Sequence, residues 1–119
     1  MNLKDKVALV TGGASGLGQA TVEAYVNLGA KVVILDINED KANEIINNLG
    51  KENVMFISTD IMKEEPVVEA INLIKEKYNH LHIAVNCAGT GYPGRILGKE
   101  APHPLDAFQF IVNLNLVGT

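Results

Sequence analysis

Continuous apolar runs alternate with amphipathic segments along the chain. The runs are short and rich in β-branched residues, as in strands buried on both faces, and four stand out: Val7–Val10, Lys31–Asp36, Val54–Ile57 and Ile83–Asn86. The segments between them repeat apolar residues at helical spacing. Strands that alternate with helices in this way predict parallel pairing through right-handed helical crossovers.

Each intervening segment carries one apolar stripe that we expect to pack on the sheet. The stripes are, in order, Leu17, Ala20, Thr21, Ala24 and Leu28; Ala42, Ile45, Ile46 and Leu49; and Val67, Ala70, Ile71, Ile74 and Tyr78. Gly29 and Gly50 end the first two helices, and Pro66 falls near the start of the third. Residues 1–119 therefore predict one doubly wound α/β domain, a Rossmann-like parallel sheet of about four strands with flanking helices.

The segment from Leu105 to Thr119 is apolar nearly all round when it is drawn as a helix. Asp106, Gln109 and Asn113 form one narrow polar stripe. Asn115 projects roughly 150° away from that stripe, on a face that we expect to be buried. A buried amide needs a partner, so Asn115 is either catalytic or a structural residue that bonds a neighbouring backbone. We expect the helix to be covered on two sides, by the sheet and by a partner.

The turn between the first strand and the first helix is rich in glycine. It comprises Thr11, Gly12, Gly13, Ala14, Ser15, Gly16, Leu17 and Gly18. Glycine lets the backbone turn tightly and approach a pyrophosphate, and the free N–H groups of the next helix favour an anion. Spaced glycines alone are a weak signal, because a purely structural turn uses them too.

Asp36 ends the second strand, 18 residues after Gly18. A carboxylate at about that distance bonds the ribose hydroxyls of a dinucleotide. It could also serve as a turn or capping residue for the helix that begins near Asn38, and the two roles are compatible. No basic residue stands in the glycine turn or directly after Asp36. Because a 2′-phosphate would need one and would be repelled by the carboxylate, we predict NAD rather than NADP.

Polar and small residues also follow the third and fourth strands, at the sheet edge where ligands collect. Asp60, with the backbone of Ile61, could meet an adenine edge, or Asp60 could simply begin a helix. The turn after the fourth strand leaves room for a ribose or nicotinamide against the backbone, through Asn86, Cys87, Ala88 and Gly89. Since no histidine stands at a telling spacing, we expect Cys87 to be a small hydrophobic residue rather than a nucleophile.

Composition narrows the function classes. The 119 residues are 47% hydrophobic with a net charge of −4, and their lysines are scattered among acids, which argues against nucleic acid as a partner. We find no membrane span and no targeting peptide, and the single cysteine fits a reducing, cytoplasmic compartment. The three histidines lack metal-binding spacing, so we expect loop residues and no metal. Arg95 and Lys99 could meet an anionic substrate or could simply be solvated.

As a set, these features resemble the short-chain dehydrogenase/reductase family. The matching pieces keep their order and spacing over nearly the whole chain: Thr11–Gly18, Asp36, Asp60–Ile61, Asn86–Gly89 and Asn113–Thr119 around Asn115. A narrower similarity, through Val85–Gly89 and Pro104–Gln109, is to members that act on 3-hydroxyacyl-CoA or hydroxysteroid substrates.

The resemblance implies a role for each piece. Ser15 and Leu17 would meet the pyrophosphate, and Asp36 the adenosine ribose. The adenine would lie by Asp60–Ile61, and the second ribose by the backbone at Cys87. Asn115 would be the family's active-site asparagine, whose helix position holds a water in a proton relay. Family members usually assemble through this last helix, which implies a homo-oligomer.

The sequence departs from the family pattern in three ways. Cys87 replaces the second residue of the usual Asn-Asn-Ala-Gly turn. Met62 stands where a small hydroxyl residue often caps the third helix, which costs typically ~1 kcal/mol. No tyrosine is followed four residues later by the lysine that the family's proton transfer uses, because Tyr25, Tyr78 and Tyr92 are followed there by Gly29, His82 and Ile96.

The sequence therefore predicts the NAD-binding part of an oxidoreductase, which precedes the Tyr-x-x-x-Lys half. The complete protein would transfer a hydride between NAD and a secondary alcohol or ketone, such as a 3-hydroxyacyl-CoA or a hydroxysteroid-like substrate. One alternative is the corresponding part of a 3-oxoacyl reductase. The other, from a different class, is a nucleotide-binding or dimerisation module without catalysis.

Overall fold

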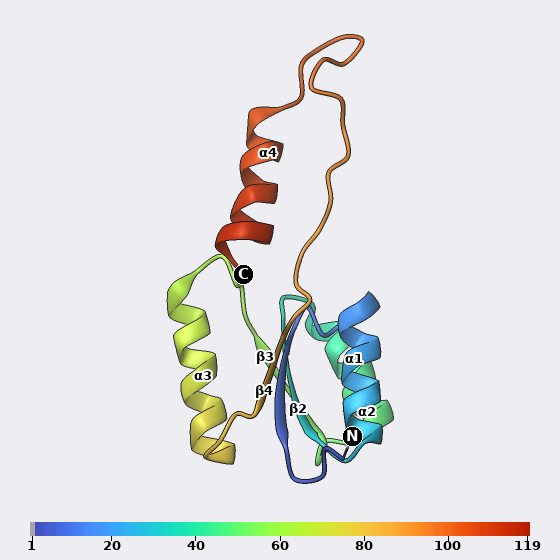
Figure 1. Ribbon diagram of the computed structural model, residues 1–119, viewed down its shortest axis with the longest axis vertical. Helices are drawn as coiled ribbons and strands as arrows, with labels where there is room; N and C mark the ends of the chain where they lie inside the picture. Colours follow the sequence, from blue (N-terminus) through green and yellow to red (C-terminus); the bar gives the residue numbers. More distant parts are fainter. Residues whose placement is uncertain (1) are drawn as a thin grey trace.

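A computed structural model, which describes residues 2–119, contains one four-stranded parallel sheet with helices on both faces (Figure 1). The elements follow in the order β1 (Val7–Thr11), α1 (Gly16–Asn27), β2 (Lys31–Asp36), α2 (Glu39–Leu49), β3 (Val54–Ser58), α3 (Glu64–Tyr78), β4 (Ile83–Asn86), α4 (Leu105–Val112) and the π-helical segment η1 (Asn113–Val117). The strand order is β3-β2-β1-β4, so the direction of winding reverses at β1. The predicted doubly wound α/β fold is confirmed.

The central strand β2 shows why the apolar runs are continuous. Val32 and Ile34 belong to the core under α1 and α2, whereas Val33 and Leu35 belong to the core under α3. Each of these four side chains is at most 1% exposed. Because both faces of the strand are covered, no polar residue alternates with the apolar ones.

The helices α2 and α3 bury the centres of their predicted stripes, Ala42 with Ile45 and Ala70 with Ile74. The stripe predicted for α1 is wrong. Leu17 is 84% exposed, and Ala20, Ala24 and Leu28 are also exposed. The buried side of α1 instead contains Gly18 and Val22. The helix approaches the glycine turn so closely at Gly18 that a Cβ there would overlap the carbonyl oxygen of Gly12, so only glycine fits. A search for large apolar residues overlooks a contact face that starts with glycine.

The last helix does not lie on the sheet. It stands beyond the carboxyl ends of the strands, at the end of the long connection from β4 (Figure 1), and none of its residues is buried. The radius of gyration is 16.3 Å, above the ~13.5 Å expected of a compact chain of this length. Our expectation that this helix is covered by the sheet is therefore wrong, since the chain carries it away from the sheet. None of the described helices is long and apolar enough to cross a bilayer.

The backbone also changes its helical form within the predicted Leu105–Thr119 helix. From Asn113 it continues as η1, in which the Gly118 N–H donates to the Asn113 carbonyl at 2.8 Å. This wider turn lies where Asn115 was predicted to face the core. The predicted single α-helix is thus an α-helix of eight residues followed by a π-helical segment.

Candidate functional site

A cavity of about 550 Å³ opens at the carboxyl ends of the strands. It lies beside β1, where the strand order reverses and doubly wound sheets bind their ligands. The cavity brings together most of the predicted site residues: Gly12, Ser15, Gly16, Leu17, Gly18, Asp36, Asp60, Ile61, Cys87, Ala88 and Gly89. Four segments that are far apart in the sequence thus converge on one cleft.

Several lining residues were not predicted. They are Leu35, Ile37, Thr59, Met62, Thr90, Phe110 and Leu114. Most adjoin a predicted motif, so that their positions follow once the motif is placed. Phe110 and Leu114 are different, because they come from α4 and η1. Their spacing of four residues on one helical face was a usable signal, but it indicated burial rather than a cleft wall.

The glycine turn packs tightly on its neighbours at one end and is open at the other. A Cβ at Gly12, where φ is +64°, would lie 2.7 Å from the backbone of Ala88. At Gly16, where φ is +54°, no atom beyond its two chain neighbours and the backbone of its own helix lies within 4 Å of the Cβ position. Gly12 therefore joins the turn to the loop after β4, while Gly16 leaves the cavity free beside α1.

The amino end of α1 offers unused hydrogen-bond donors to this cavity. Ser15 is the N-cap, and its side chain makes no capping bond. The first N–H that bonds back into the helix is that of Gln19, which donates to the Ser15 carbonyl at 3.1 Å. The free N–H groups before it and the positive end of the helix dipole favour an anion. No Lys or Arg among residues 2–119 lines this cavity, so the backbone is its main source of positive potential.

The Asp36 carboxylate fixes the adjoining corner of the cavity. Its Oδ2 accepts the Ala14 N–H at 3.0 Å, and its Oδ1 accepts the Asn38 N–H at 3.0 Å. Asn38 in turn caps α2 by accepting the Lys41 N–H at 3.1 Å. Asp36 therefore has the predicted turn role, and each carboxylate oxygen keeps acceptor capacity for a ribose hydroxyl.

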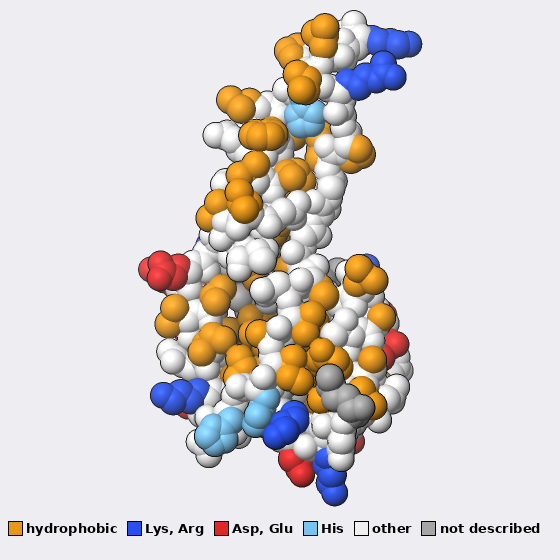
Figure 2. Space-filling view, in the orientation of Figure 1, with side chains coloured by type: hydrophobic (Ala, Val, Ile, Leu, Met, Phe, Trp, Pro, Cys, Tyr) orange, Lys and Arg blue, Asp and Glu red, His pale blue; other side chains and the backbone are white. Residues whose placement is uncertain are grey.

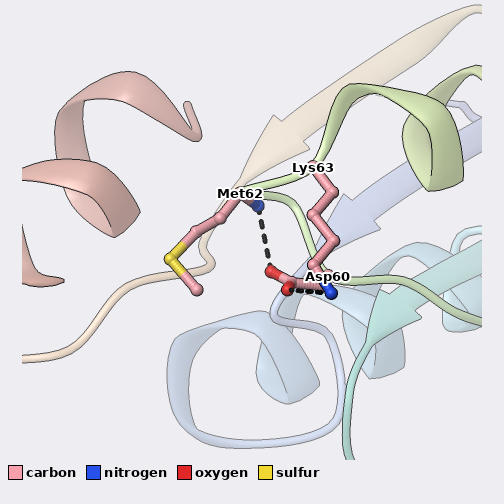
Figure 3. A network of polar contacts seen from close by, with 3 residues as sticks. All are labelled: Asp60, Met62 and Lys63. Carbon is pink, nitrogen blue, oxygen red and sulfur yellow. Dashed lines mark hydrogen bonds and ion pairs between the residues drawn. The ribbon is translucent and has the colours of Figure 1, made fainter.

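Asp60 shapes the entry to α3 (Figure 3). Its Oδ1 accepts the Met62 N–H at 3.0 Å, and its Oδ2 lies 3.6 Å from Lys63 Nζ. The N-cap of α3 is Lys63, whose side chain makes no capping bond. Our expectation that Met62 occupies the capping position is therefore wrong by one residue. Met62 instead lines the cavity.

Three predicted site residues, Thr11, Asn86 and Asn115, do not line the cavity. Thr11 is buried, and its Oγ1 accepts the N–H groups of Cys87 and Ala88, each at 3.2 Å. Asn86 pairs with Thr11 in the β1–β4 ladder and is exposed. Thr11 therefore fixes the Cys87–Ala88 backbone through hydrogen bonds without lining the cavity itself. Cys87 lines the cavity and also packs against the core, as expected of a small hydrophobic residue.

Asn115 is exposed, so the prediction that it is buried is wrong. Each polar atom of its amide nonetheless has one partner, because the loop after β4 runs past η1. Nδ2 donates to the Thr90 carbonyl at 2.8 Å, and Oδ1 accepts the Thr90 N–H at 3.1 Å. A Cβ at Gly89 would lie 2.8 Å from the same Oδ1. These contacts fit the structural alternative, in which the amide bonds a neighbouring backbone.

A second cavity, of about 270 Å³, lies between α1 and α2. The glycine turn borders it through Ala14–Gly16, and α2 borders it through Lys41, Glu44 and Asn48. Lys41 and the glycine turn thus border the same cavity, although our search for a basic residue covered only the turn itself and the residues directly after Asp36.

Within residues 2–119, no group of three His, Cys, Asp or Glu side chains could hold a metal ion.

Comparisons with known proteins agree with this architecture. A family model described as "short chain dehydrogenase" matches residues 6–119. A 3-hydroxyacyl-CoA dehydrogenase type-2 of Drosophila melanogaster is 41% identical over 98% of the chain, and one of Homo sapiens is 39% identical over 99%. The chain spans 46% of the length of each of these relatives. A crystal structure of a short chain dehydrogenase from Bacillus anthracis superposes with a TM-score of 0.89 at 22% identity, covering 99% of this chain and 47% of that one.

Proposed function

The chain belongs to the short chain dehydrogenase family, and from this premise we propose that it forms the NAD-binding part of an oxidoreductase. The observation that carries the proposal is the cavity of about 550 Å³, which gathers the glycine turn, Asp36, Asp60–Ile61 and Cys87–Gly89. The lining of this cavity fits a dinucleotide, since it includes unused backbone N–H donors at the start of α1 and the fixed carboxylate of Asp36. The open side of Gly16 leaves room for the ligand.

In this proposal, different parts of the cavity lining hold different parts of the cofactor. The N–H groups at the start of α1 hold the pyrophosphate, and Asp36 accepts the hydroxyls of the adenosine ribose. Ile61 and its neighbours provide an apolar wall for adenine, and the backbone of Cys87–Gly89 adjoins the second ribose. When bound, the nicotinamide ring supplies or accepts a hydride.

Asn115 enters this proposal as a positioning residue. Both polar atoms of its side chain are bonded to Thr90, so the amide fixes the loop that forms the cavity wall. The water relay at its helix position stays a prediction from the resemblance. No tyrosine–lysine pair at the family spacing occurs in these 119 residues, so the proton-transferring acid/base is not among them.

Two of the relatives are named 3-hydroxyacyl-CoA dehydrogenase, which supports an acyl-CoA as the substrate of the complete protein. That protein would oxidise the secondary alcohol of a 3-hydroxyacyl thioester to the ketone. Lys41 does not line the main cavity but the second one, which Glu44 also lines. We therefore keep NAD rather than NADP as the proposed cofactor.

An amide NMR titration of the chain with NADH tests the proposed binding mode. We expect saturable shift changes at the glycine turn, at Asp36, at Ile61 and at Cys87–Gly89. The amides of Lys75 and Lys77, at the far end of α3, are the internal control and should not shift. The proposal is wrong if NADH causes no saturable change, or if the changes fall on Lys41, Glu44 and Asn48 of the smaller cavity and spare Asp36, Ile61 and Cys87–Gly89.

A further inference from the structure

His82 joins β1 to β4 through both its backbone and its side chain. Its N–H donates to the Val7 carbonyl at 2.9 Å, and its Nδ1 accepts the Val7 N–H at 3.1 Å. The residue before β4 therefore engages both backbone polar groups of the first residue of β1. The two residues stand 75 positions apart in the chain, and their bonds close the amino end of the β1–β4 pair.

The direction of the side-chain bond fixes the protonation state of the ring. A backbone N–H can only donate, so Nδ1 of His82 must carry a lone pair and the proton of the neutral ring lies on Nε2. Both nitrogens of a protonated imidazole are donors, so a protonated His82 would set an N–H against the Val7 N–H. Histidine changes its charge between about pH 5 and pH 8. The bond forms with the neutral ring and is lost as the pH falls.

The two partners differ in their access to water. His82 is exposed, so its ring exchanges protons with the solvent. Val7 is only 5% exposed, and its side chain packs in the core under α3. A buried N–H needs a partner, so the Val7 N–H must reach water when His82 releases it. Loss of the bond therefore requires a local opening at the start of β1.

The surroundings of His82 offer a protonated ring no anionic partner. No acidic oxygen in the described part of the chain lies within 4.0 Å of a His82 nitrogen. The ring of His80 lies edge-on to it, with the centroids 6.1 Å apart. Figure 2 shows histidine and basic side chains gathered at this end of the molecule, opposite the last helix. The other titratable side chains on the adjoining segments are Asp5 and Lys6 before β1, and Glu76, Lys77 and Tyr78 at the end of α3.

We infer that His82 is a pH-sensitive switch at the amino end of the β1–β4 pair. The neutral ring holds the Val7 N–H, and the protonated ring releases it, so that the first residues of the two strands separate as the pH falls. The carboxyl end of the same pair is held differently, because Thr11 Oγ1 accepts the N–H groups of Cys87 and Ala88. Opening at His82 therefore leaves the candidate cofactor site in place, and the inference does not depend on the proposed function.

Hydrogen exchange of the Val7 amide, followed by NMR at about pH 7.5 and about pH 6.0, tests this inference. Dividing the intrinsic exchange rate by the measured rate at each pH gives a protection factor. In the unaltered chain we expect the factor for Val7 to be at least about threefold lower at the lower pH. In His82→Asn, whose Oδ1 accepts an N–H but does not titrate, it should change by less than about 1.5-fold. His80→Asn is the matched control and should behave as the unaltered chain does.

The amide of Val33, which is fully buried in β2, reports on unfolding of the whole sheet and should change by less than about 1.5-fold. The inference is overturned if the protection of Val7 in the unaltered chain does not change with pH, or if His82→Asn keeps the change. It is also overturned if Val33 loses as much protection as Val7, or if His80→Asn abolishes the effect.

The nitrogen chemical shifts of the His82 ring give a second test that needs no variant. In the unaltered chain at about pH 7.5 they should show the proton on Nε2, because Nδ1 accepts the Val7 N–H. A proton on Nδ1 at that pH would equally overturn the inference.

Discussion

Gly18 tolerates the least change of any residue in the glycine turn. The position faces the Gly12 carbonyl so closely that an added methyl group would overlap the oxygen. Both partners are backbone atoms, so neither can move aside by a change of rotamer. The residue therefore sets how closely α1 approaches β1 and the cavity.

We predict that Gly18→Ala lowers the free energy of unfolding by about 3 kcal/mol, because the helix must shift from the turn. Urea denaturation followed by circular dichroism measures the change. Gly91→Ala is the matched control, since no atom beyond the glycine and its two chain neighbours lies within 4 Å of its Cβ position, and it should change stability by less than about 0.5 kcal/mol. Equal stability of the two variants would show that the close approach at Gly18 is absent in solution.

At the residue scale, short-range patterns in the sequence predicted most of the residues that line the main cavity. The glycines and Asp36 were predictable because their chemistry depends on spacing along one strand–turn–helix unit. The wall formed by Phe110 and Leu114 was not predictable, because it depends on where the long connection after β4 returns. Asn115 was misplaced for the same reason, since helical periodicity gives a direction around an axis but not the side on which the sheet lies.

At the scale of elements, α1 shows the limit of apolar periodicity. Counting large side chains selected the face that contains Leu17, yet the helix turns Gly18 and Val22 to the sheet. The strands were predicted to within a residue at either end, because burial on both faces leaves an uninterrupted apolar run. The bounds of a strand that is buried on both faces are thus easier to infer from its sequence than the orientation of a helix that approaches the sheet through glycine.

Two truncations in α1 separate the predicted face from the observed one. Val22 is fully buried, so Val22→Ala should destabilise the fold by about 2 kcal/mol through the cavity it leaves. Leu17→Ala should change stability by less than about 0.5 kcal/mol, because its side chain is 84% exposed. Thermal and urea unfolding of both variants give the comparison. A larger loss for Leu17→Ala would mean that the predicted stripe, and not Val22, faces the core.

At the scale of the whole molecule, the strand order creates the site. Parallel pairing brings the carboxyl ends of all four strands to one edge of the sheet, and the cavity lies at that edge beside β1, where the strand order reverses. Alternating strands and helices predicted parallel pairing, but no pattern within a single strand specifies its neighbour. The edge of the sheet at which the cavity lies could be predicted once the fold class was known. The contribution of α4 and η1 to the wall of the cavity could not.

The proposed preference for NAD also belongs to this scale, because it depends on Asp36 and on the lack of a Lys or Arg side chain among the described residues that line the main cavity. The carboxylate is held by Ala14 and Asn38, so it cannot turn away from a ligand without losing two hydrogen bonds. The 2′-phosphate of NADP would therefore approach a fixed negative charge and be repelled by it. Repulsion of about 1.4 kcal/mol would weaken the binding of NADP about tenfold relative to NAD. Lys41 lies in the neighbouring cavity with Glu44 rather than in this one.

The ratio of the dissociation constants of NADPH and NADH, measured by fluorescence titration of the chain, tests the central claim most directly. We predict that NADH binds at least about tenfold more tightly, and that Asp36→Asn narrows this difference by removing the charge while keeping an acceptor. Asp40→Asn, an exposed acid in the first turn of α2, is the control and should leave the ratio unchanged. Equal or tighter binding of NADPH by the unaltered chain would contradict the account.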